Sequence, residues 1–296
     1  MVDILLHSNQ LEVKVSSVIG ASLSKFSFRR PDGQSIDLMR PPGDKARDAL
    51  DMSMYPMVPY AGRIRGGSFV YWGVRHIVPQ NHPFLTEPLN GDGWTEKWRV
   101  TERSENFITL TYQHTGETGF PFPYSASIVY GVSGHKFTAV ISVTNTGDFP
   151  MPCGLGWHPF FLRTKDMRIR MRNRQLWADE NKAIKTQIQN TPEHMLFTDD
   201  RALDDMDADA CFGGFDGKIE ITYPSHRIRL NVAAKGDCSH VTLYTPADKK
   251  WVCIEPMTNA TDAFNLASAG VSGTGIKTIQ DGESFKLETS FSVTSF

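Results

Sequence analysis

Short stretches in which every second residue is hydrophobic recur from one end of the chain to the other. This period-two pattern is typical of a β-strand with one face buried and the other in water. The clearest stretches are residues 11–15, 107–112, 136–143, 167–171, 227–232 and 285–291. Turn-favouring Asp, Asn and Gly residues lie between several of them, as at 31–33, 145–147, 215–217 and 280–282. The pattern predicts a chain built mainly of half-buried strands.

Helical periodicity is scarce by comparison. Residues 44–54 and 180–189 could each hold a few helical turns, but strands and helices do not alternate as they do in βαβ units. No Pro/Ser-rich linker, change of composition or long repeat marks a domain boundary. We therefore expect an all-β chain of antiparallel strands, with residues 1–296 forming a single domain.

Composition and charge narrow the class of partner. The chain has 296 residues, of which 40% are hydrophobic, so a sizeable core is available and the composition is that of a globular protein. The formal net charge is −2 and no block of basic residues occurs, which disfavours binding to nucleic acid or to an anionic membrane. A neutral or weakly charged small molecule fits this chain better.

The cysteines and the first residues bear on the compartment. The four cysteines (Cys153, Cys211, Cys238 and Cys253) show neither a C-x-x-C pair nor a spacing with histidines that is typical of a zinc site. We interpret them as reduced thiols. The N-terminal residues lack the basic and apolar regions of a signal peptide, and no apolar run approaches membrane-spanning length. The sequence predicts a cytoplasmic protein without membrane segments.

Two titratable residues stand directly before prolines. His158 precedes Pro159, and Glu255 precedes Pro256 at the end of an apolar run. A proline ring disfavours helical backbone at the preceding residue, so both side chains are expected on extended chain. Either residue alone is more often a packing or surface residue. Together they offer one acid and one base on extended backbone.

Both residues lie in segments that resemble a known family. Gly154–Phe161 (GLGWHPFF) and Ile254–Asn259 (IEPMTN) resemble the two signature segments of the aldose 1-epimerase (galactose mutarotase-like) family, and residues 59–65, 88–94 and 209–212 also match in the family's order. The resemblance covers most of the chain. It implies one large, twisted antiparallel β sandwich, the galactose mutarotase-like supersandwich, with a wide concave face that holds a sugar.

The resemblance also implies roles for individual residues. Glu255 is expected to be the general base and His158 the general acid that interconvert the anomers of an aldose, with the roles exchanged on ring closure. Arg63 matches a substrate-binding arginine, although the family commonly has Asn where Gly62 stands; a guanidinium can donate two hydrogen bonds to vicinal hydroxyls. Asp209 matches a position that hydrogen-bonds sugar hydroxyls.

The glycine-rich loop at 88–94 contributes Asn90 and Trp94. Either Trp94 places its ring against a sugar face, or it is a core residue of a hairpin. Family members usually have His where Asn90 stands. An Asn side chain can hydrogen-bond a hydroxyl, but it cannot carry a proton or a charge at neutral pH.

We therefore expect an isomerase that acts on a free monosaccharide without a metal or an organic cofactor, as a monomer or a homodimer. Two alternatives stay open. A mutarotase of phosphorylated hexoses would need a cationic anchor, for which Arg63, Arg65 and Arg75 are available. A non-catalytic carbohydrate-binding protein on the same scaffold is favoured by Asn90.

Overall fold

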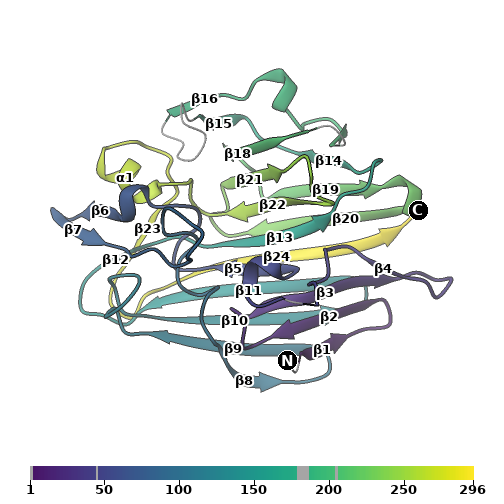
Figure 1. The fold of residues 1–296 in the computed structure, drawn as a ribbon, viewed down its shortest axis with the longest axis horizontal. Coiled ribbons are helices and arrows are strands. Elements are labelled where there is room, and N and C mark those ends of the chain that lie inside the picture. Colours follow the sequence, from purple (N-terminus) through teal and green to yellow (C-terminus); the bar gives the residue numbers. More distant parts are fainter. Residues whose placement is uncertain (1–2, 45, 179–186, 204–205) are drawn as a thin grey trace.

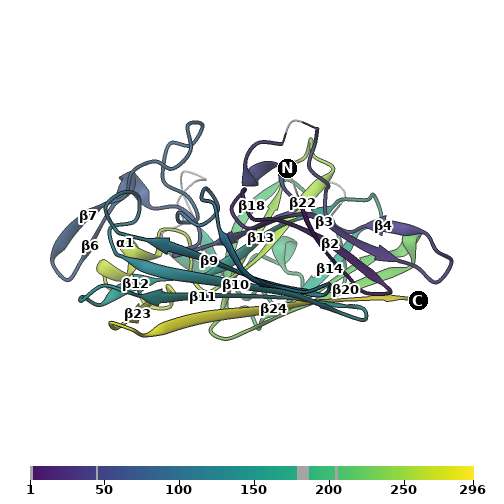
Figure 2. The ribbon, with the colours of Figure 1, turned by 90° about the horizontal axis from the view of Figure 1, so that it is seen from below.

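The computed structural model describes residues 3–44, 46–178, 187–203 and 206–296, and within them strands dominate (Figure 1). The strands form two large antiparallel sheets that lie one over the other, as the view from below shows (Figure 2). The prediction of an all-β antiparallel sandwich is therefore confirmed. The described part of the chain contains no helix with the length and hydrophobicity that crossing a membrane requires.

The larger sheet has eleven strands among the described residues. They follow one another in space as β1 (Ile4–His7), β2 (Leu11–Ser16), β3 (Ser22–Arg29), β5 (Met54–Met57), β13 (Gly156–Leu162), β22 (Trp251–Met257), β21 (His240–Thr245), β18 (Ala208–Gly213), β15 (Gln175–Ala178) and β16 (Gln187–Asn190), while β4 (Ser35–Asp37) pairs with β3. Strands that are far apart in the sequence thus become neighbours at the centre of this sheet.

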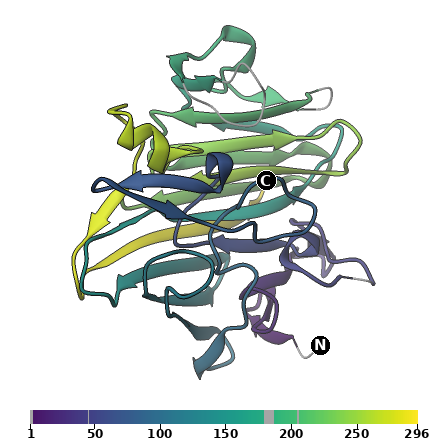
Figure 3. The same cartoon turned by 60° about the vertical axis from the view of Figure 1, so that its left-hand side comes forward.

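The second sheet has nine strands among the described residues. Their order is β17 (Arg201–Ala202), β14 (Arg168–Met171), β19 (Lys218–Tyr223), β20 (Ile228–Lys235), β24 (Ser284–Ser295), β11 (Lys136–Asn145), β10 (Tyr124–Ser133), β9 (Phe107–His114) and β8 (Arg99–Arg103). Two small sheets pair β12 (Met151–Cys153) with β23 (Lys277–Ile279) and β6 (Ser68–Tyr71) with β7 (Val74–Ile77). The blue β6–β7 hairpin comes forward in Figure 3, where it lies beside the short helix α1 (Ala263–Ser268).

Aromatic side chains from both large sheets fill the space between them. Trp157 on β13 lies against Tyr130 on β10, with ring centroids 5.6 Å apart, and Phe26 on β3 lies 5.5 Å from Phe137 on β11. All four are fully buried, and each such side chain contributes about 1.5–3 kcal/mol to folding. Because side chains alternate along a strand, Trp157 faces this core while His158 lies on the opposite face of the sheet.

The alternating stretches predicted as strands all fall on strands, namely β2, β9, β11, β14, β20 and β24. No α-helix forms in the described residues of these segments. The described residues of 44–54 hold a single 3-10 turn, η1 (Ala49–Asp51), and Gln187–Asn190 pairs with β15 as a strand. Residues 180–186 of that second segment lie outside the described residues. The sequence pattern does not indicate α1, and the single domain of 1–296 stays a prediction.

Candidate active site

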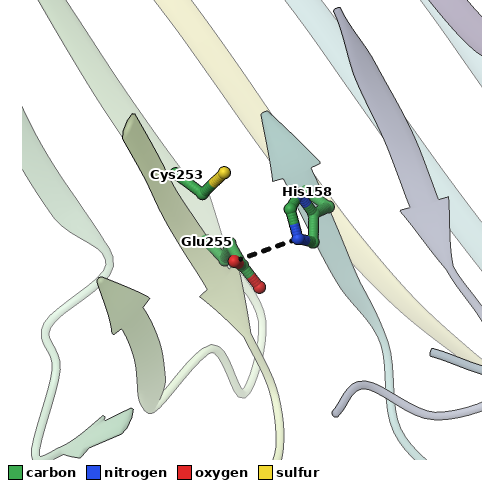
Figure 4. Close-up of side chains that lie close together, drawn as sticks. All are labelled: His158, Cys253 and Glu255. Carbon is green, nitrogen blue, oxygen red and sulfur yellow. Dashed lines mark ion pairs between the residues drawn. The ribbon is translucent and has the colours of Figure 1, made fainter. Parts of the chain in front are cut away.

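His158 and Glu255 lie across from each other on the neighbouring strands β13 and β22. The antiparallel register pairs Gly156 with Met257 and Phe160 with Cys253. His158, two positions after Gly156, therefore faces Glu255, two positions before Met257. His158 Nε2 lies 3.2 Å from Glu255 Oε1 (Figure 4). Their side chains are 12% and 7% exposed. The sheet therefore brings the two residues proposed as acid and base into direct contact.

Two further strands extend this row of side chains across the sheet. Tyr55 on β5 pairs with His158, and Thr242 on β21 pairs with Glu255. The next row, two residues further along each strand, consists of Phe160, Cys253, Tyr244 and Asp209. Together the two rows form a continuous floor of aromatic and polar side chains on the face that is turned away from the core.

Aromatic rings enclose the imidazole of His158. Tyr55 stacks on it with 4.5 Å between ring centroids, and the Phe160 centroid lies 4.6 Å away. Burial, together with the positive charge of Arg40, lowers the pKa of His158 to about 3. His158 is therefore neutral at pH 7. Because a carboxylate only accepts hydrogen bonds, a hydrogen on His158 Nε2 completes the contact with Glu255.

Asn90 holds Tyr55 in place. The Asn90 Nδ2 amide donates a hydrogen bond of 2.9 Å to the Tyr55 hydroxyl, and its Oδ1 accepts one of 2.7 Å from the backbone N–H of Gly62. Asn90 is 2% exposed and adopts a left-handed conformation, with φ of 58°, which Asn tolerates better than most residues. Burial raises the pKa of Tyr55 well above its usual value, so the phenol stays neutral. Asn90 therefore connects the loop to the ring beneath His158.

A cavity of about 390 Å³ opens above this floor. A volume of roughly 300–1,000 Å³ is typical of sites for small molecules. The cavity is lined by Arg40, Leu50, Tyr55, Gly62, Arg63, Leu85, Leu89, Asn90, His158, Phe160, Asp209, Thr242, Tyr244, Trp251, Glu255, Met257 and Thr261. Of the residues named from the sequence, His158, Glu255, Arg63, Asn90 and Asp209 thus meet around one space, although they come from five separate segments.

Trp94 does not belong to the residues that line this cavity. It is 1% exposed and lies against Tyr55, with ring centroids 5.5 Å apart, while its indole N–H donates to the carbonyl of Leu89. The expectation that Trp94 offers its ring to a sugar therefore does not match its position. A fully buried ring supports Tyr55 from behind, as in the alternative of a core tryptophan.

The arginines proposed as a phosphate anchor do not gather at the cavity. Arg63 lines it, but Arg65 lies 3.9 Å from the carboxylate of Asp262, and Arg75 donates to Ser68 Oγ on the β6–β7 hairpin. Among the described residues that line the cavity, neither Arg65 nor Arg75 is found. Only Arg63 of the three arginines therefore lies where it could meet a ligand in this cavity.

The cavity contains an arginine that the sequence analysis did not single out. The guanidinium of Arg40 lies over the Phe160 ring, 3.7 Å from its centroid, and 4.8 Å from that of Trp251. It donates to the backbone carbonyls of Leu50 and Met52. Burial lowers the pKa of Arg40, and the neighbouring acidic groups oppose that shift. The stacking and the two hydrogen bonds hold the positive charge in one place.

A shared sequence signal marks two of the residues that sequence reasoning missed, Arg40 and Tyr55. Arg40 precedes Pro41 and Tyr55 precedes Pro56, just as His158 and Glu255 precede prolines. The proline fixes extended backbone at the preceding residue, which then presents its side chain from a strand or its end. The remaining missed residues, Tyr244 and Trp251 among them, carry no comparable local signal.

Three side chains of the floor offer donor atoms that could hold a metal ion. Nitrogen of His158, sulfur of Cys253 and a carboxylate oxygen of Glu255 all lie within 4.8 Å of one another (Figure 4). Cys253 is fully buried, and this burial raises the pKa of its thiol well above the usual value. In the absence of a cation the thiol is therefore protonated.

Comparison with known proteins places the chain in a family. The family model described as aldose 1-epimerase matches residues 3–292. The Escherichia coli K12 protein YphB is 27% identical over 260 residues, which cover 85% of this chain and 87% of that protein. The crystal structure of a candidate aldose 1-epimerase from Escherichia coli K12 superimposes with a TM-score of 0.89 at 25% identity, covering 100% of this chain and 99% of the other. A galactose mutarotase-like protein from Clostridium acetobutylicum shares the fold, with a TM-score of 0.86 at 17% identity over 99% and 95% of the two chains.

Proposed function

The chain belongs to the aldose 1-epimerase family, and from this premise we propose that it interconverts the α and β anomers of a free aldose by general acid–base catalysis. The observation that carries this function is the contact of 3.2 Å between His158 Nε2 and Glu255 Oε1 at the floor of the cavity. An acid and a base held this close to each other can serve two oxygens of the same small molecule.

The chemistry of anomerisation requires such a pair. Ring opening removes a proton from the hydroxyl on C1 and delivers one to the ring oxygen. Both oxygens are bonded to the same carbon, so the groups that serve them have to lie side by side. Glu255 takes the proton of the C1 hydroxyl. His158 takes up a second proton with the sugar, enters the step as the imidazolium, gives its Nε2 hydrogen to the ring oxygen as the C1–O bond breaks, and is left as neutral imidazole. Each positioned group typically contributes about 10²–10⁴-fold to the rate.

Ring closure uses the same two groups in exchanged roles. The open aldehyde rotates about the bond between C1 and C2, so that the other face of the carbonyl meets the hydroxyl. His158 then takes back the hydrogen from that hydroxyl as it attacks, and Glu255 returns its proton to the carbonyl oxygen. Both residues end in their starting states, and the chemistry consumes no co-reactant.

The other lining residues suit a sugar. Arg63 and Asp209 supply a donor fork and an acceptor for ring hydroxyls. Phe160, Tyr244 and Trp251 supply aromatic surface, against which the C–H groups of a sugar ring pack. This mixture of a few polar groups and several aromatic rings is typical of a site for an uncharged polyol.

The direct test measures the approach to anomeric equilibrium. Freshly dissolved α-D-glucose, α-D-galactose and other aldoses are followed by polarimetry, and exchange between anomers at equilibrium is measured by NMR. We expect acceleration over the spontaneous rate with at least one free aldose. Binding of aldoses without any acceleration would instead support the carbohydrate-binding alternative, and binding is measured in the same samples by calorimetry.

A further inference from the structure

Cys253 is a floor residue that lies beside the acid–base pair and takes no part in the proton transfers. It stands two residues before Glu255 on the same face of β22, and across from Phe160 on β13. In Figure 4 its sulfur lies on the same side of the sheet as the His158 ring and the Glu255 carboxylate. The three donor atoms lie within 4.8 Å of one another.

We propose that His158, Cys253 and Glu255 form a site for a thiophilic divalent cation, with Zn²⁺ as the reference ion, and that such an ion inhibits the enzyme. Imidazole nitrogen, thiolate sulfur and carboxylate oxygen are the ligands that Zn²⁺ prefers, at about 2.0–2.3 Å. At these bond lengths, tetrahedral geometry places the donor atoms of any two ligands somewhat more than about 3 Å apart. The 3.2 Å between His158 Nε2 and Glu255 Oε1 already meets this spacing.

Charge also favours a divalent cation at this place. Binding removes the thiol proton of Cys253, which passes to solvent, and a metal–sulfur bond takes its place. With Glu255 ionised and His158 neutral, the ligand set then carries two negative charges, which match the two positive charges of the ion. The hydrogen on His158 Nε2 has to move to Nδ1, so that the Nε2 lone pair can face the metal. No electron is transferred in this process.

The positive charge of Arg40 acts in two directions. It lies close enough to Cys253 to favour the thiolate, and it also repels a cation. Arg40 is held by the carbonyls of Leu50 and Met52 and by the Phe160 ring, so it does not enter the ligand set. We therefore expect a reversible site of moderate affinity, and not a permanently occupied zinc site.

Inhibition follows from the identity of the ligands. An ion bound by His158 and Glu255 would occupy both the acid and the base, and both of these ligands line the cavity where the sugar would lie. Sugar and metal then compete for one place. The predicted inhibition rests on the proposed function, whereas the predicted metal binding does not.

The experiment titrates chelator-treated, full-length protein with Co²⁺ and then displaces Co²⁺ with Zn²⁺. A thiolate ligand gives a sulfur-to-cobalt charge-transfer band in the near ultraviolet, and one proton is released to the buffer per ion. We expect the band in the unmodified protein, its loss in Cys253→Ala, and Zn²⁺ binding weakened by at least about thirtyfold in that variant. The matched control is Cys238→Ala, because Cys238 is also buried but does not belong to the donor cluster of the described residues.

Activity gives the second readout. Zn²⁺ should inhibit anomerisation competitively in the unmodified protein and in Cys238→Ala, and at much higher concentration in Cys253→Ala. A band of unchanged intensity in Cys253→Ala, or equal Zn²⁺ affinity in the two alanine variants, would overturn the site. If Cys253→Ala does not fold, the unmodified protein still decides the question, since Co²⁺ binding without a thiolate band excludes Cys253 as a ligand. A protein that shows the band but never accelerates anomerisation would retain the metal site and lose the proposed function.

Discussion

The ring of Tyr55 lies nearly parallel to the imidazole of His158, with 17° between their planes and 4.5 Å between their centroids. The Tyr55 hydroxyl in turn accepts the amide hydrogen of Asn90. Asn90 thus reaches the proposed acid through a ring and without touching it. An asparagine at this place orients the site through Tyr55, and its side-chain oxygen is already engaged by Gly62.

We expect Asn90→Ala and Tyr55→Phe each to lower kcat by about 3–10-fold, because each removes the same hydrogen bond, worth roughly 0.5–1.5 kcal/mol. KM should change less than kcat, because the loss concerns the orientation of His158. The double variant should lose little more than Asn90→Ala alone, since Asn90→Ala already breaks the bond to Tyr55 and also the bond from the Gly62 N–H. Steady-state kinetics of the native protein, the two single variants and the double variant checks this prediction. Fully additive losses would show that Asn90 and Tyr55 act independently of each other.

Asn90→His tests whether a second imidazole adds to the chemistry. One acid and one base complete the proton transfers, so we expect kcat to change by less than about tenfold and no new ionisation to appear in its pH profile. The profile is measured for both proteins with the same sugar. A large gain in kcat, accompanied by a second pKa typical of His, would show that the native protein lacks a catalytic group at position 90.

Glu255→Gln should abolish anomerisation while sugar binding stays within about tenfold, because the amide keeps the shape of the side chain but cannot take a proton. Binding by calorimetry and turnover by NMR exchange are measured on the same preparation. The matched control is Glu102→Gln, a change of the same kind at an exposed position on β8. Near-native turnover in Glu255→Gln would remove Glu255 from the mechanism.

The fold and the central pair could be predicted because both depend on local signals. Alternating residues give the strands, and His158 and Glu255 stand before prolines within recognisable segments. The same prolines also argue against placing these segments at the centre of a sheet, since proline has no backbone N–H to donate to a neighbouring strand. Yet Pro56, Pro159 and Pro256 lie on β5, β13 and β22, three neighbours in the middle of the larger sheet. The residue before each of the three contributes its side chain to the cavity.

The rest of the site depends on the order in which the strands join. Tyr55 stacks on His158 because β5 pairs with β13. Arg40 stacks on Phe160 because the neighbouring Met39 forms a bridge with Phe161 on β13. The local pattern does not contain that order. Trp94 shows the same limit, since a large aromatic residue in a loop suits either a core or a sugar face. Its position behind Tyr55 decides for the core.

The lowered pKa of His158 predicts an unusual pH profile. Burial and the charge of Arg40 bring the pKa to about 3 in the empty site, whereas an ordinary His titrates near ~6.5. We therefore expect kcat/KM, which reports the free enzyme, to fall steadily between pH 5 and 8 with the protonated fraction of His158, without the inflection that an ordinary His gives near pH ~6.5. His158→Asn should lose most of the rate at every pH. A limb near pH ~6.5 that moves when Arg40 is replaced by Met would show that His158 titrates in the working range.

A second buried histidine predicts how stability depends on pH. His240 is 2% exposed, and burial lowers its pKa to about 4. Between the unfolded pKa of ~6.5 and the folded pKa of about 4, His240 is protonated in the unfolded chain and neutral in the folded chain. The free energy of unfolding therefore decreases as pH falls through this range, by up to about 1.4 kcal/mol per pH unit. His240→Gln should reduce the loss measured by urea unfolding at pH 7 and pH 5. His7→Gln, a change of the same kind at an exposed position, should leave the loss of stability between pH 7 and pH 5 unchanged.

The charges around the cavity predict which sugars are accepted. Arg40 and Arg63 bring two positive charges and Asp209 and Glu255 two negative charges, so the charged residues that line the cavity cancel while His158 is neutral. The Arg40 guanidinium already donates to two backbone carbonyls, which leaves it less free to clamp a phosphate with both edges. We expect kcat/KM for free hexoses to exceed that for their 6-phosphates by at least about tenfold, because the cavity holds no excess positive charge to balance the phosphate dianion.

Competition between paired substrates, followed by NMR, measures this ratio directly. Arg75→Gln is the control, because Arg75 lies on the β6–β7 hairpin and does not line the cavity; it should leave the ratio unchanged. Arg40→Gln should lower activity toward free hexoses without raising their 6-phosphates above them, since it removes one of the two positive charges. The opposite result, faster turnover of 6-phosphates that is lost on replacing Arg40 or Arg63, would assign these arginines to a phosphate anchor and make the phosphorylated sugar the substrate.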